Sequence, residues 1–390
     1  MDLPARLWID HPAGLGEPAA AAGAAPWIAL DTEANSMFVY REQVCLLQLN
    51  LGGRLFLVDT LALAPPADAL GVRTPSPALA PLAGALGDPA IPLYLHGGEY
   101  DVGCLKRDYG ISLRGVWDSQ QAASLLGWEK TGYGAVVERV CGVVLDKAFT
   151  QYDWATRPLS PGAERYALDD VIYLPQVCDQ LRGLVRAADL EEEVQIANQA
   201  VEATSWSGGF DPAGFWRIKG VREVPAHCLG VLTALYAWRD ALARSCNLPP
   251  GRLLNNEVLL AVARQQPTNF QLLKKMGLRS WFLAAHGEAL IAVLRTATAD
   301  PPAVPARPRG REVAPEEEER ETRLKDWRRA EAERRTREEA RPVPLQVVLP
   351  ARALEFLKQH GAGPLDQVPQ LGAKRIRRYG DKLLELCRRG

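Results

Sequence analysis

Short apolar runs occur along the first half of the chain at residues 27–30, 44–49, 54–58 and 91–95. Runs of this length between turn residues are typical of buried strands. Asn-Leu-Gly-Gly separates the second run from the third, so these two are predicted to pair as an antiparallel hairpin. Residues 65–92 are rich in Pro, Ala and Gly and are expected to hold one short helix between loops. With helical stretches after the later runs, this order predicts an α/β domain with a mixed sheet.

In the second half of the chain the apolar positions take a helical period instead. Leu229, Leu232 and Leu235 recur every third residue, which predicts helices that share one core. The pattern Leu-x-x-Trp-Arg at residues 235–239 returns at residues 324–328, and two later parts of it return at similar offsets of about 90 residues. A period this long exceeds that of solenoid repeats and predicts two small helical domains in tandem.

Charge is distributed unevenly between the two halves. Residues 1–195 contain 14 Lys and Arg against 25 Asp and Glu, whereas residues 196–390 contain 32 against 22. An acidic half that gathers cations and a basic half that holds phosphate would have this distribution, and so would ordinary solvated surface. Residues 307–341 carry 23 charges among 35 positions, which predicts either a solvated helix with i,i+4 ion pairs or a flexible linker.

Composition excludes several classes of protein. No apolar run approaches the ~18 residues that a membrane-spanning helix needs. The Ala-rich stretch at residues 18–25 has no basic flank and is not expected to be a signal peptide. Seven cysteines without a C-x-x-C pair indicate reduced thiols. A secreted, disulfide-stapled or membrane-spanning protein is therefore excluded, and a cytoplasmic location is predicted.

Carboxylates lie at three places in the acidic half where a strand or helix would present them together. Asp31 and Glu33 directly follow an apolar strand and share one face, since side chains at i and i+2 point to the same side. Asp101 lies just after a strand-to-helix switch. Tyr166 and Asp170 are four residues apart, which places them on one face of a helix.

Acidic oxygen ligands suit Mg²⁺ or Mn²⁺ better than zinc, which prefers His and Cys. Carboxylates held side by side would repel each other unless a cation lay between them. Two such ions can activate a water and stabilise the leaving oxygen of a phosphodiester. The acidic half therefore predicts metal-dependent phosphodiester hydrolysis that needs no nucleotide cofactor.

In this order the motifs resemble those of ribonuclease D, a family of DEDD-type 3′→5′ exonucleases with a tyrosine in the third motif. The three motifs occupy residues 28–33, 96–101 and 166–171, and the resemblance covers nearly the whole chain. It implies a ribonuclease H-like α/β exonuclease domain with a mixed central sheet, followed by two small all-α HRDC-like domains. The expected boundaries are residues 1–200 for the exonuclease domain, 212–299 for the first HRDC domain, 300–319 for a charged linker and 320–390 for a second, divergent HRDC-like domain.

The resemblance also implies roles for single residues. Asp31, Glu33, Asp101 and Asp170 would ligate two divalent metal ions, Mg²⁺ or Mn²⁺, and Tyr166 would position the attacking water. Glu33 would in addition contact the terminal ribose. The implied reaction trims RNA with an accessible 3′ end and releases 5′-mononucleotides, with tRNA precursors or other small stable RNAs as substrates. A DNA-directed 3′→5′ exonuclease and a non-catalytic nucleic-acid-binding scaffold are the alternatives.

Three further residues near the motifs allow more than one interpretation. Asp169 neighbours Asp170, but only Asp170 is four residues from Tyr166, so Asp170 is favoured as the ligand. Asp118 is expected to cap a helix rather than to take part in catalysis. His96 opens the second motif and would either line the rim of the site or serve the fold.

Basic and aromatic residues outside the acidic motifs are candidates for holding phosphate. A solvated helix face is the alternative for the C-terminal group. The nucleic-acid-binding candidates are Lys147, Trp154, Arg157, Lys374, Arg375, Arg377 and Arg378.

Overall fold

The computed structural model describes residues 3–64, 67–69, 72–206, 208–308, 311 and 313–388. The chain forms two compact units. One unit combines the chain up to residue 34 with residues 43–206 and the segment from residue 313 onward, and the other combines residues 35–42 with residues 207–312. None of the helices in the described ranges has the length and apolar character needed to cross a membrane.

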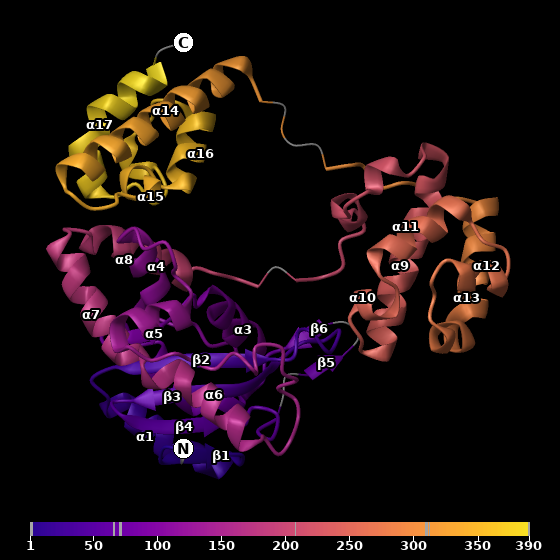
Figure 1. Ribbon diagram of the computed structural model, residues 1–390, viewed down its shortest axis with the longest axis horizontal. Coiled ribbons are helices and arrows are strands. Elements are labelled where there is room, and N and C mark those ends of the chain that lie inside the picture. The colour runs from indigo at the N-terminus through magenta and orange to yellow at the C-terminus, as the bar shows by residue number, and fades with distance from the viewer. Residues whose placement is uncertain are drawn as a thin grey trace. The chain divides into compact units, whose positions relative to one another are not determined.

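A six-stranded mixed sheet organises the first unit (Figure 1). In spatial order its strands are β1 (Arg6–Ile9), β4 (Arg54–Val58), β3 (Val44–Leu51), β2 (Ile28–Ala34), β7 (Leu93–Leu95) and β8 (Val116–Asp118). Strands β2, β3 and β4 pair antiparallel, which confirms the predicted hairpin, whereas β1, β7 and β8 join parallel to their neighbours. The predicted mixed sheet is therefore confirmed.

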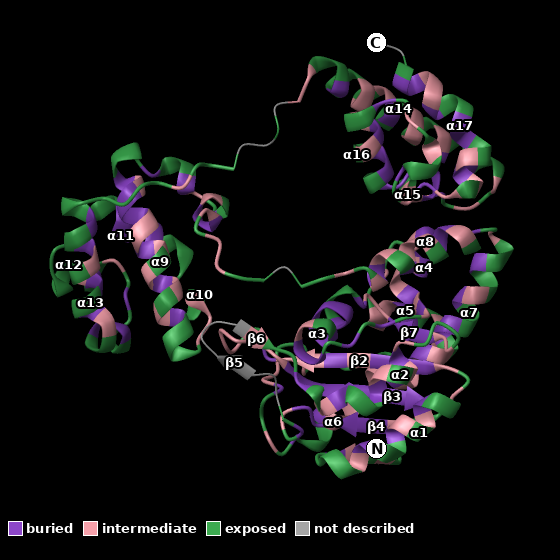
Figure 2. Cartoon of the chain, turned by 180° about the vertical axis from the view of Figure 1, so that it is seen from behind, coloured by how far each residue is buried: buried purple, intermediate pink, exposed green. Residues whose placement is uncertain are grey.

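Helices cover both faces of this sheet. On one face lie α1 (Gly16–Ala24), α2 (Ala80–Leu86) and α3 (Glu99–Tyr109), and on the other lie α6 (Pro161–Ile172) and α7 (Leu174–Ala187). All eight residues of β3 are buried, as expected for a strand covered on both faces (Figure 2). The polar residues of this strand therefore lie inside the protein.

The α/β domain contains further helices and strands. The segment at residues 65–92, predicted to hold one helix, contains α2 and also two short strands that pair with each other. The sequence did not predict this hairpin or β1, because both carry too few alternating apolar positions. These other elements are β5 (Ala67–Ala69), β6 (Val72–Thr74), α4 (Ser119–Leu125), α5 (Tyr133–Cys141), α8 (Glu191–Glu202), and the 3₁₀ turns η1 (Pro12–Leu15) and η2 (Pro77–Leu79).

The first helical domain lies in the second unit, where Leu232 and Leu235 are buried in one core as predicted. The loop at residues 35–42 belongs to the same unit, and the Tyr40 hydroxyl donates to the carboxylate of Asp240 at 2.9 Å. The elements of this domain are η3 (Gly214–Arg217), η4 (Val221–Glu223), η5 (Ala226–Cys228), α9 (Leu229–Cys246), α10 (Pro250–Leu253), α11 (Asn256–Gln265), α12 (Phe270–Lys275) and α13 (Ser280–Ala299).

The second helical domain shares its core with helices α4, α5, α7 and α8 of the α/β domain. Its first helix begins at Pro315, within the linker expected at residues 300–319, because a proline and three glutamates suit a helix N-terminus. Residues 309, 310 and 312 of that linker lie outside the described residues. Its elements are α14 (Pro315–Glu338), α15 (Leu345–Val348), α16 (Ala351–His360), η6 (Leu365–Gln367) and α17 (Ala373–Arg388).

The highly charged run is largely helical, as one of the two predictions for it required. Within α14, Lys325 pairs with Glu321 and Arg334 pairs with Glu338, at 2.5 and 2.6 Å. These i,i+4 pairs support a helix that has few apolar residues of its own.

Candidate active site

Strand β2 carries the first two predicted ligands, Asp31 and Glu33, where it leaves the core. Residues 28–30 are buried, and the two acidic side chains that follow are half-buried on the sheet face that α6 covers. The register of β2 against β3 shifts after Glu33, so regular pairing ends beside these carboxylates. The strand therefore presents two acids at the edge of the core.

Helix α6 brings the third acid to the same place. Ser160 caps its N-terminus by accepting from the Ala163 amide, and Asn50 of β3 donates to the Val171 carbonyl at 3.1 Å. The helix is thereby held against the sheet with Asp170 directed toward β2. One carboxylate oxygen from each of Asp31, Glu33 and Asp170 lies within 4.8 Å of the other two.

Asp101 approaches from the opposite face of the sheet and is not one of the three acids whose oxygens lie within 4.8 Å of one another. It lies in the first turn of α3, is 7% exposed, and accepts from Thr32 through the backbone amide at 3.1 Å and the hydroxyl at 2.5 Å. Thr32 stands between Asp31 and Glu33, so these two bonds hold Asp101 against the strand that carries both acids. The sequence did not single out Thr32, although its place inside Asp-Thr-Glu was the available signal.

The turn before α3 is held by Asp118. Gly97 has φ of +66°, and a Cβ there would lie 2.8 Å from the Gln120 side chain. The Asp118 carboxylate accepts from the amides of Gly97 and Gly98 at 3.0 and 2.8 Å, and from the amide of Gln120 at 2.8 Å. The predicted helix-capping role of Asp118 is confirmed. The same carboxylate also fixes the turn that delivers Asp101.

Burial and mutual repulsion dominate the electrostatics of the four acids. Burial raises the pKa of Glu33 to about 9 and that of Asp170 to about 8, and neighbouring carboxylates add to both shifts. The pKa of Asp31 rises well above its usual value for the same two reasons. Burial raises the pKa of Asp101 to about 6, against the lowering effect of the Thr32 hydrogen bonds. No lysine or arginine pairs with these four acids in the described part of the chain.

A bound cation would directly offset the repulsion among these carboxylates. Carboxylate oxygens that lie close together without a positive partner are the donor set of a hard divalent ion. The residues present therefore fit a divalent metal centre of the type that the sequence predicts.

Tyr166 lies one turn before Asp170 within a cluster of aromatic rings. Its ring centroid lies 6.0 Å from that of Phe149 and 5.9 Å from that of Trp154. Burial, with a contribution from Asp170, raises the pKa of Tyr166 to about 12, so its hydroxyl stays protonated near neutral pH. Asp169, the alternative to Asp170 as a ligand, forms an ion pair with Arg165 at 2.8 Å.

His96 lies beside the cluster but among its own partners. Its Nδ1 lies 2.8 Å from the Ser119 hydroxyl, and its ring centroid lies 5.1 Å from that of Tyr133. Burial lowers the pKa of His96 to about 4, so the ring is neutral near pH 7. These contacts match the interpretation in which His96 serves the fold.

The three candidates for phosphate binding near the third motif lie in different surroundings. Lys147 is exposed, whereas Trp154 is 3% exposed and packs against Tyr166. Arg157 donates to both oxygens of Asp59, at 2.6 and 2.8 Å, and to backbone carbonyls. Only Lys147 of these three presents its charge to solvent without a described ion-pair partner.

Two of the basic residues on α17 serve internal contacts. Lys374 pairs with Asp189 at 2.9 Å and with Glu193 at 3.4 Å, both on or next to α8. Arg375 is 3% exposed and donates to the carbonyls of four residues. In this structure both side chains help to assemble the unit rather than face a nucleic acid.

The other two basic residues of α17 face outward. Arg377 is exposed, with no ion-pair partner within the ranges that the structure describes. Arg378 is exposed, lies 4.0 Å from Glu339 and places its guanidinium 5.7 Å from the centre of the Tyr379 ring.

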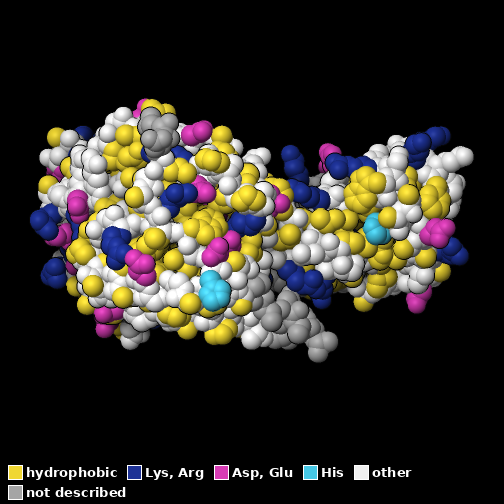
Figure 3. Space-filling model, turned by 90° about the horizontal axis from the view of Figure 1, so that it is seen from below, with side chains coloured by type: hydrophobic (Ala, Val, Ile, Leu, Met, Phe, Trp, Pro, Cys, Tyr) yellow, Lys and Arg dark blue, Asp and Glu magenta, His cyan; other side chains and the backbone are white. Residues whose placement is uncertain are grey.

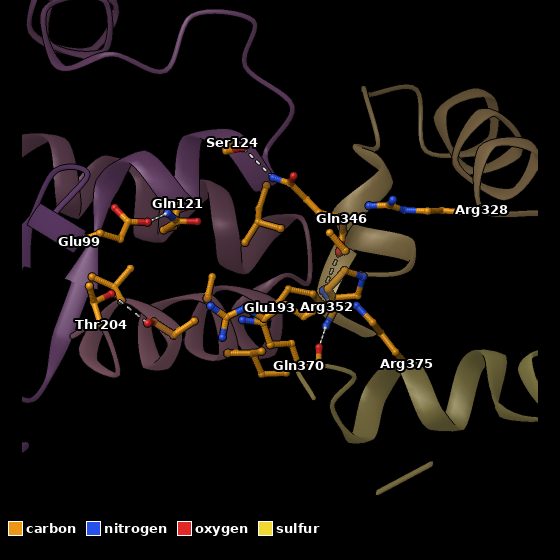
Figure 4. Close-up of a pocket in the computed structure, with 17 residues that line it drawn as sticks. Glu99, Gln121, Ser124, Glu193, Thr204, Arg328, Gln346, Arg352, Gln370 and Arg375 are labelled. Carbon is orange, nitrogen blue, oxygen red and sulfur yellow. Dashed lines mark hydrogen bonds between the residues drawn. The ribbon is translucent and has the colours of Figure 1, made fainter. Parts of the chain in front are cut away.

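A cavity of about 390 Å³ lies away from the acids, between the exonuclease helices and the second helical domain (Figure 4). Glu99 and Gln121 line one wall, and Arg352 and Arg375 line the other. The Gln346 amide donates to the Ser124 hydroxyl across it at 2.6 Å. None of the five catalytic candidates lines this cavity, so it is not the predicted site.

Family models match both the α/β domain and the first helical domain, and curated relatives match most of the chain. A 3′-5′ exonuclease family model matches residues 7–186, and an HRDC domain model matches residues 229–294. The chain is 31% identical over 293 residues to ribonuclease D of Gluconacetobacter diazotrophicus, which covers 74% of this chain and 71% of that protein. It is 30% identical over 295 residues to ribonuclease D of Granulibacter bethesdensis, which covers 74% of this chain and 70% of that one.

The chain belongs to the ribonuclease D family. The crystal structure of Escherichia coli RNase D matches it with a TM-score of 0.69 and 25% identity, covering 98% of both chains. The protein is therefore a hydrolytic 3′–5′ exoribonuclease with an exonuclease domain and a helical, HRDC-containing C-terminal region, as its motifs predict. The ribonuclease D family acts on RNA and depends on metal, and the acidic cluster supplies a place for such an ion.

Proposed function

We propose that this ribonuclease D-type enzyme removes nucleotides one at a time from RNA 3′ ends through a centre of two divalent ions, Mg²⁺ or Mn²⁺. The observation that carries the proposal is the cluster of Asp31, Glu33 and Asp170, whose oxygens lie within 4.8 Å of one another. Asp101 would complete the ligand set. Ions held there would supply an activated water and a stabilised leaving oxygen.

The protein's own groups have distinct tasks in this scheme. Thr32 engages Oδ1 of Asp101, which leaves Oδ2 as the candidate ligand atom. Tyr166 keeps its proton near neutral pH and would use it to orient the attacking water for in-line displacement. Glu33 would also accept from the terminal ribose. Positioning and charge compensation would then supply most of the rate.

RNA binding outside the centre is proposed for exposed cations only. Lys147 precedes the third motif, and Arg377 and Arg378 face outward from α17. Each would contact backbone phosphates without reading sequence. Trp154, Arg157, Lys374 and Arg375 would act indirectly, because their contacts are internal.

The proposed substrates are tRNA precursors and other small stable RNAs. The Escherichia coli relative is described as an exoribonuclease involved in structured RNA processing. A shared family and an intact set of catalytic candidates support the same class of substrate here. The seven free cysteines are consistent with the cytoplasmic location that we propose.

Product and substrate analysis tests this proposal. Purified protein with Mg²⁺ is given a precursor tRNA with a 3′ extension, an unstructured RNA of the same length, and the matched DNA. We expect 5′-mononucleotides as products and trimming that stops near the folded part of the precursor. Release of 3′-phosphates or of oligonucleotides would contradict the mechanism, and faster loss of DNA than of RNA would contradict the substrate.

A further inference from the structure

The side chain of Gln48 is buried without any hydrogen-bond partner. It is 0% exposed, and neither its amide nitrogen nor its amide oxygen has a partner in the structure. A buried amide left without hydrogen bonds lowers the stability of the fold relative to one that is paired. Such a group in a native protein calls for a specific explanation, and an absent water or ion is one of the recognised ones.

The position of Gln48 supplies that explanation. It lies on β3 directly opposite Asp31 of β2, and Leu57 of β4 lies opposite it on the other side. Residues paired across antiparallel strands point to the same face with Cβ atoms about 4.5–5.5 Å apart. The Gln48 side chain therefore leaves its strand beside that of Asp31, on the sheet face that α6 covers.

Its neighbour Asn50 shows what a satisfied amide on this face looks like. Two residues along the same strand, Asn50 donates to the Val171 carbonyl at 3.1 Å and accepts from the Gly53 amide at 2.9 Å. Both ends of that amide hold the fold together. Gln48 does nothing comparable, and an apolar side chain of the same size would pack there at lower cost.

We propose that Gln48 is a positioning residue for the metal centre: its amide donates to the carboxylate of Asp31 when that carboxylate holds a metal ion. The bond would fix the direction in which Asp31 presents its oxygens, as hydrogen bonds to metal ligands commonly do. The inference rests on the proposed function, because it requires that Asp31 bind a metal.

The test compares Gln48→Met with Leu57→Met, the matched control on the next strand. Thermal unfolding in EDTA and Mn²⁺ affinity by calorimetry are measured for both variants and for the unsubstituted protein. Gln48→Met should unfold in EDTA at the same or a higher temperature than the unsubstituted protein. Its Mn²⁺ affinity should fall roughly ten- to a hundredfold. Leu57→Met should leave Mn²⁺ affinity unchanged.

Other results would overturn the inference in distinguishable ways. Unchanged Mn²⁺ affinity in Gln48→Met, with normal binding by the unsubstituted protein, would overturn the role of Gln48 alone. If Gln48→Met unfolds in EDTA at a lower temperature than Leu57→Met, the amide serves the metal-free fold. The same conclusion follows if neither Gln48→Met nor Gln48→Leu folds. No Mn²⁺ binding by the unsubstituted protein would overturn the proposed function as well.

Discussion

The acidic cluster and the basic helix α17 are both dense in charge, but the fold treats them in opposite ways. In the cluster, Asp31, Glu33 and Asp170 come together with no lysine or arginine partner among the described residues, and their pKa values rise. On α17, Lys374 meets acidic partners and Arg375 is surrounded by carbonyl oxygens.

The difference indicates which charged residues bind a ligand and which stabilise the fold. Uncompensated charge lowers the stability of the fold and persists at sites that bind something. Compensated charge contributes to the fold and needs no ligand. On the face seen in Figure 3, acidic and basic side chains are interspersed over the larger, left-hand part of the view.

The largest effect should come from removing the charge of one of the four proposed metal ligands. Asp31→Asn and Asp101→Asn are near-isosteric, and each should lower the single-turnover rate of RNA trimming by about 10³-fold, because the metal ligand set is lost. Asp169→Asn is the matched control, since Asp169 pairs with Arg165 instead. An equal loss in Asp169→Asn would contradict the assignment of Asp170 over its neighbour.

A smaller loss is expected at Tyr166, which carries no charge. Tyr166→Phe keeps the aromatic packing and removes only the hydroxyl, so the rate at saturating RNA should fall by about 10²-fold while RNA affinity is retained. Tyr152→Phe, in the same aromatic cluster, should behave like the unsubstituted protein. A fall in RNA affinity with an unchanged rate would assign Tyr166 to binding.

The raised pKa values of the cluster should make the stability of the metal-free protein depend on pH. The pKa values of Glu33 and Asp170 in the folded protein are raised to about 9 and about 8, so the folded state binds more protons than the unfolded state between pH 5 and those values. The metal-free protein should therefore lose stability as the pH rises from about 5 to 9. Thermal unfolding in EDTA measures this slope.

Asp31→Asn should flatten that slope, and Mg²⁺ should stabilise the unsubstituted protein more at pH 9 than at pH 6, because protons compete with the ion. Stability that rises with pH throughout this range would contradict the raised pKa values.

On α17 the expected effect is on stability. Lys374→Ala removes ion pairs with Asp189 and Glu193 and should lower the free energy of unfolding by about 1 kcal/mol. RNA affinity should not change. Denaturant titration and a binding assay together check this, and weaker RNA binding at unchanged stability would return Lys374 to the phosphate-binding group.

The smallest effect is expected at Arg377, which is exposed. Arg377→Ala should leave the unfolding temperature unchanged and weaken RNA binding about twofold, as for one phosphate contact among several. The slope of affinity against salt concentration should fall by about one for the same reason. An unchanged slope would show that Arg377 is an ordinary surface residue.

The order of the three motifs, through their resemblance to ribonuclease D, indicated the catalytic candidates. Local spacing predicted that Asp31 and Glu33 share a strand face and that Tyr166 and Asp170 lie on one helix. Gln48 was not predictable in the same way. Its partner is set by strand register, and its only signal was a lone amide in an apolar strand.

The parts of the fold that the sequence missed depend on distant contacts. Strand β1 is four residues long and forms because β4 offers it an edge. The second helical domain shares a core with exonuclease helices, a contact that the repeat in the sequence did not indicate. Helical periodicity identifies an apolar face and does not say which neighbour covers it.

The most direct test of the catalytic assignment is metal-dependent trimming of a 5′-labelled RNA with a short single-stranded 3′ tail. The reaction is followed in Mg²⁺, after EDTA, and after excess Mg²⁺ is restored, with Asp31→Asn alongside. We expect a ladder that shortens from the 3′ end, stops with EDTA, resumes with Mg²⁺ and is absent in Asp31→Asn. Intact RNA with folded protein in both Mg²⁺ and Mn²⁺, or a ladder that EDTA does not stop, would contradict it.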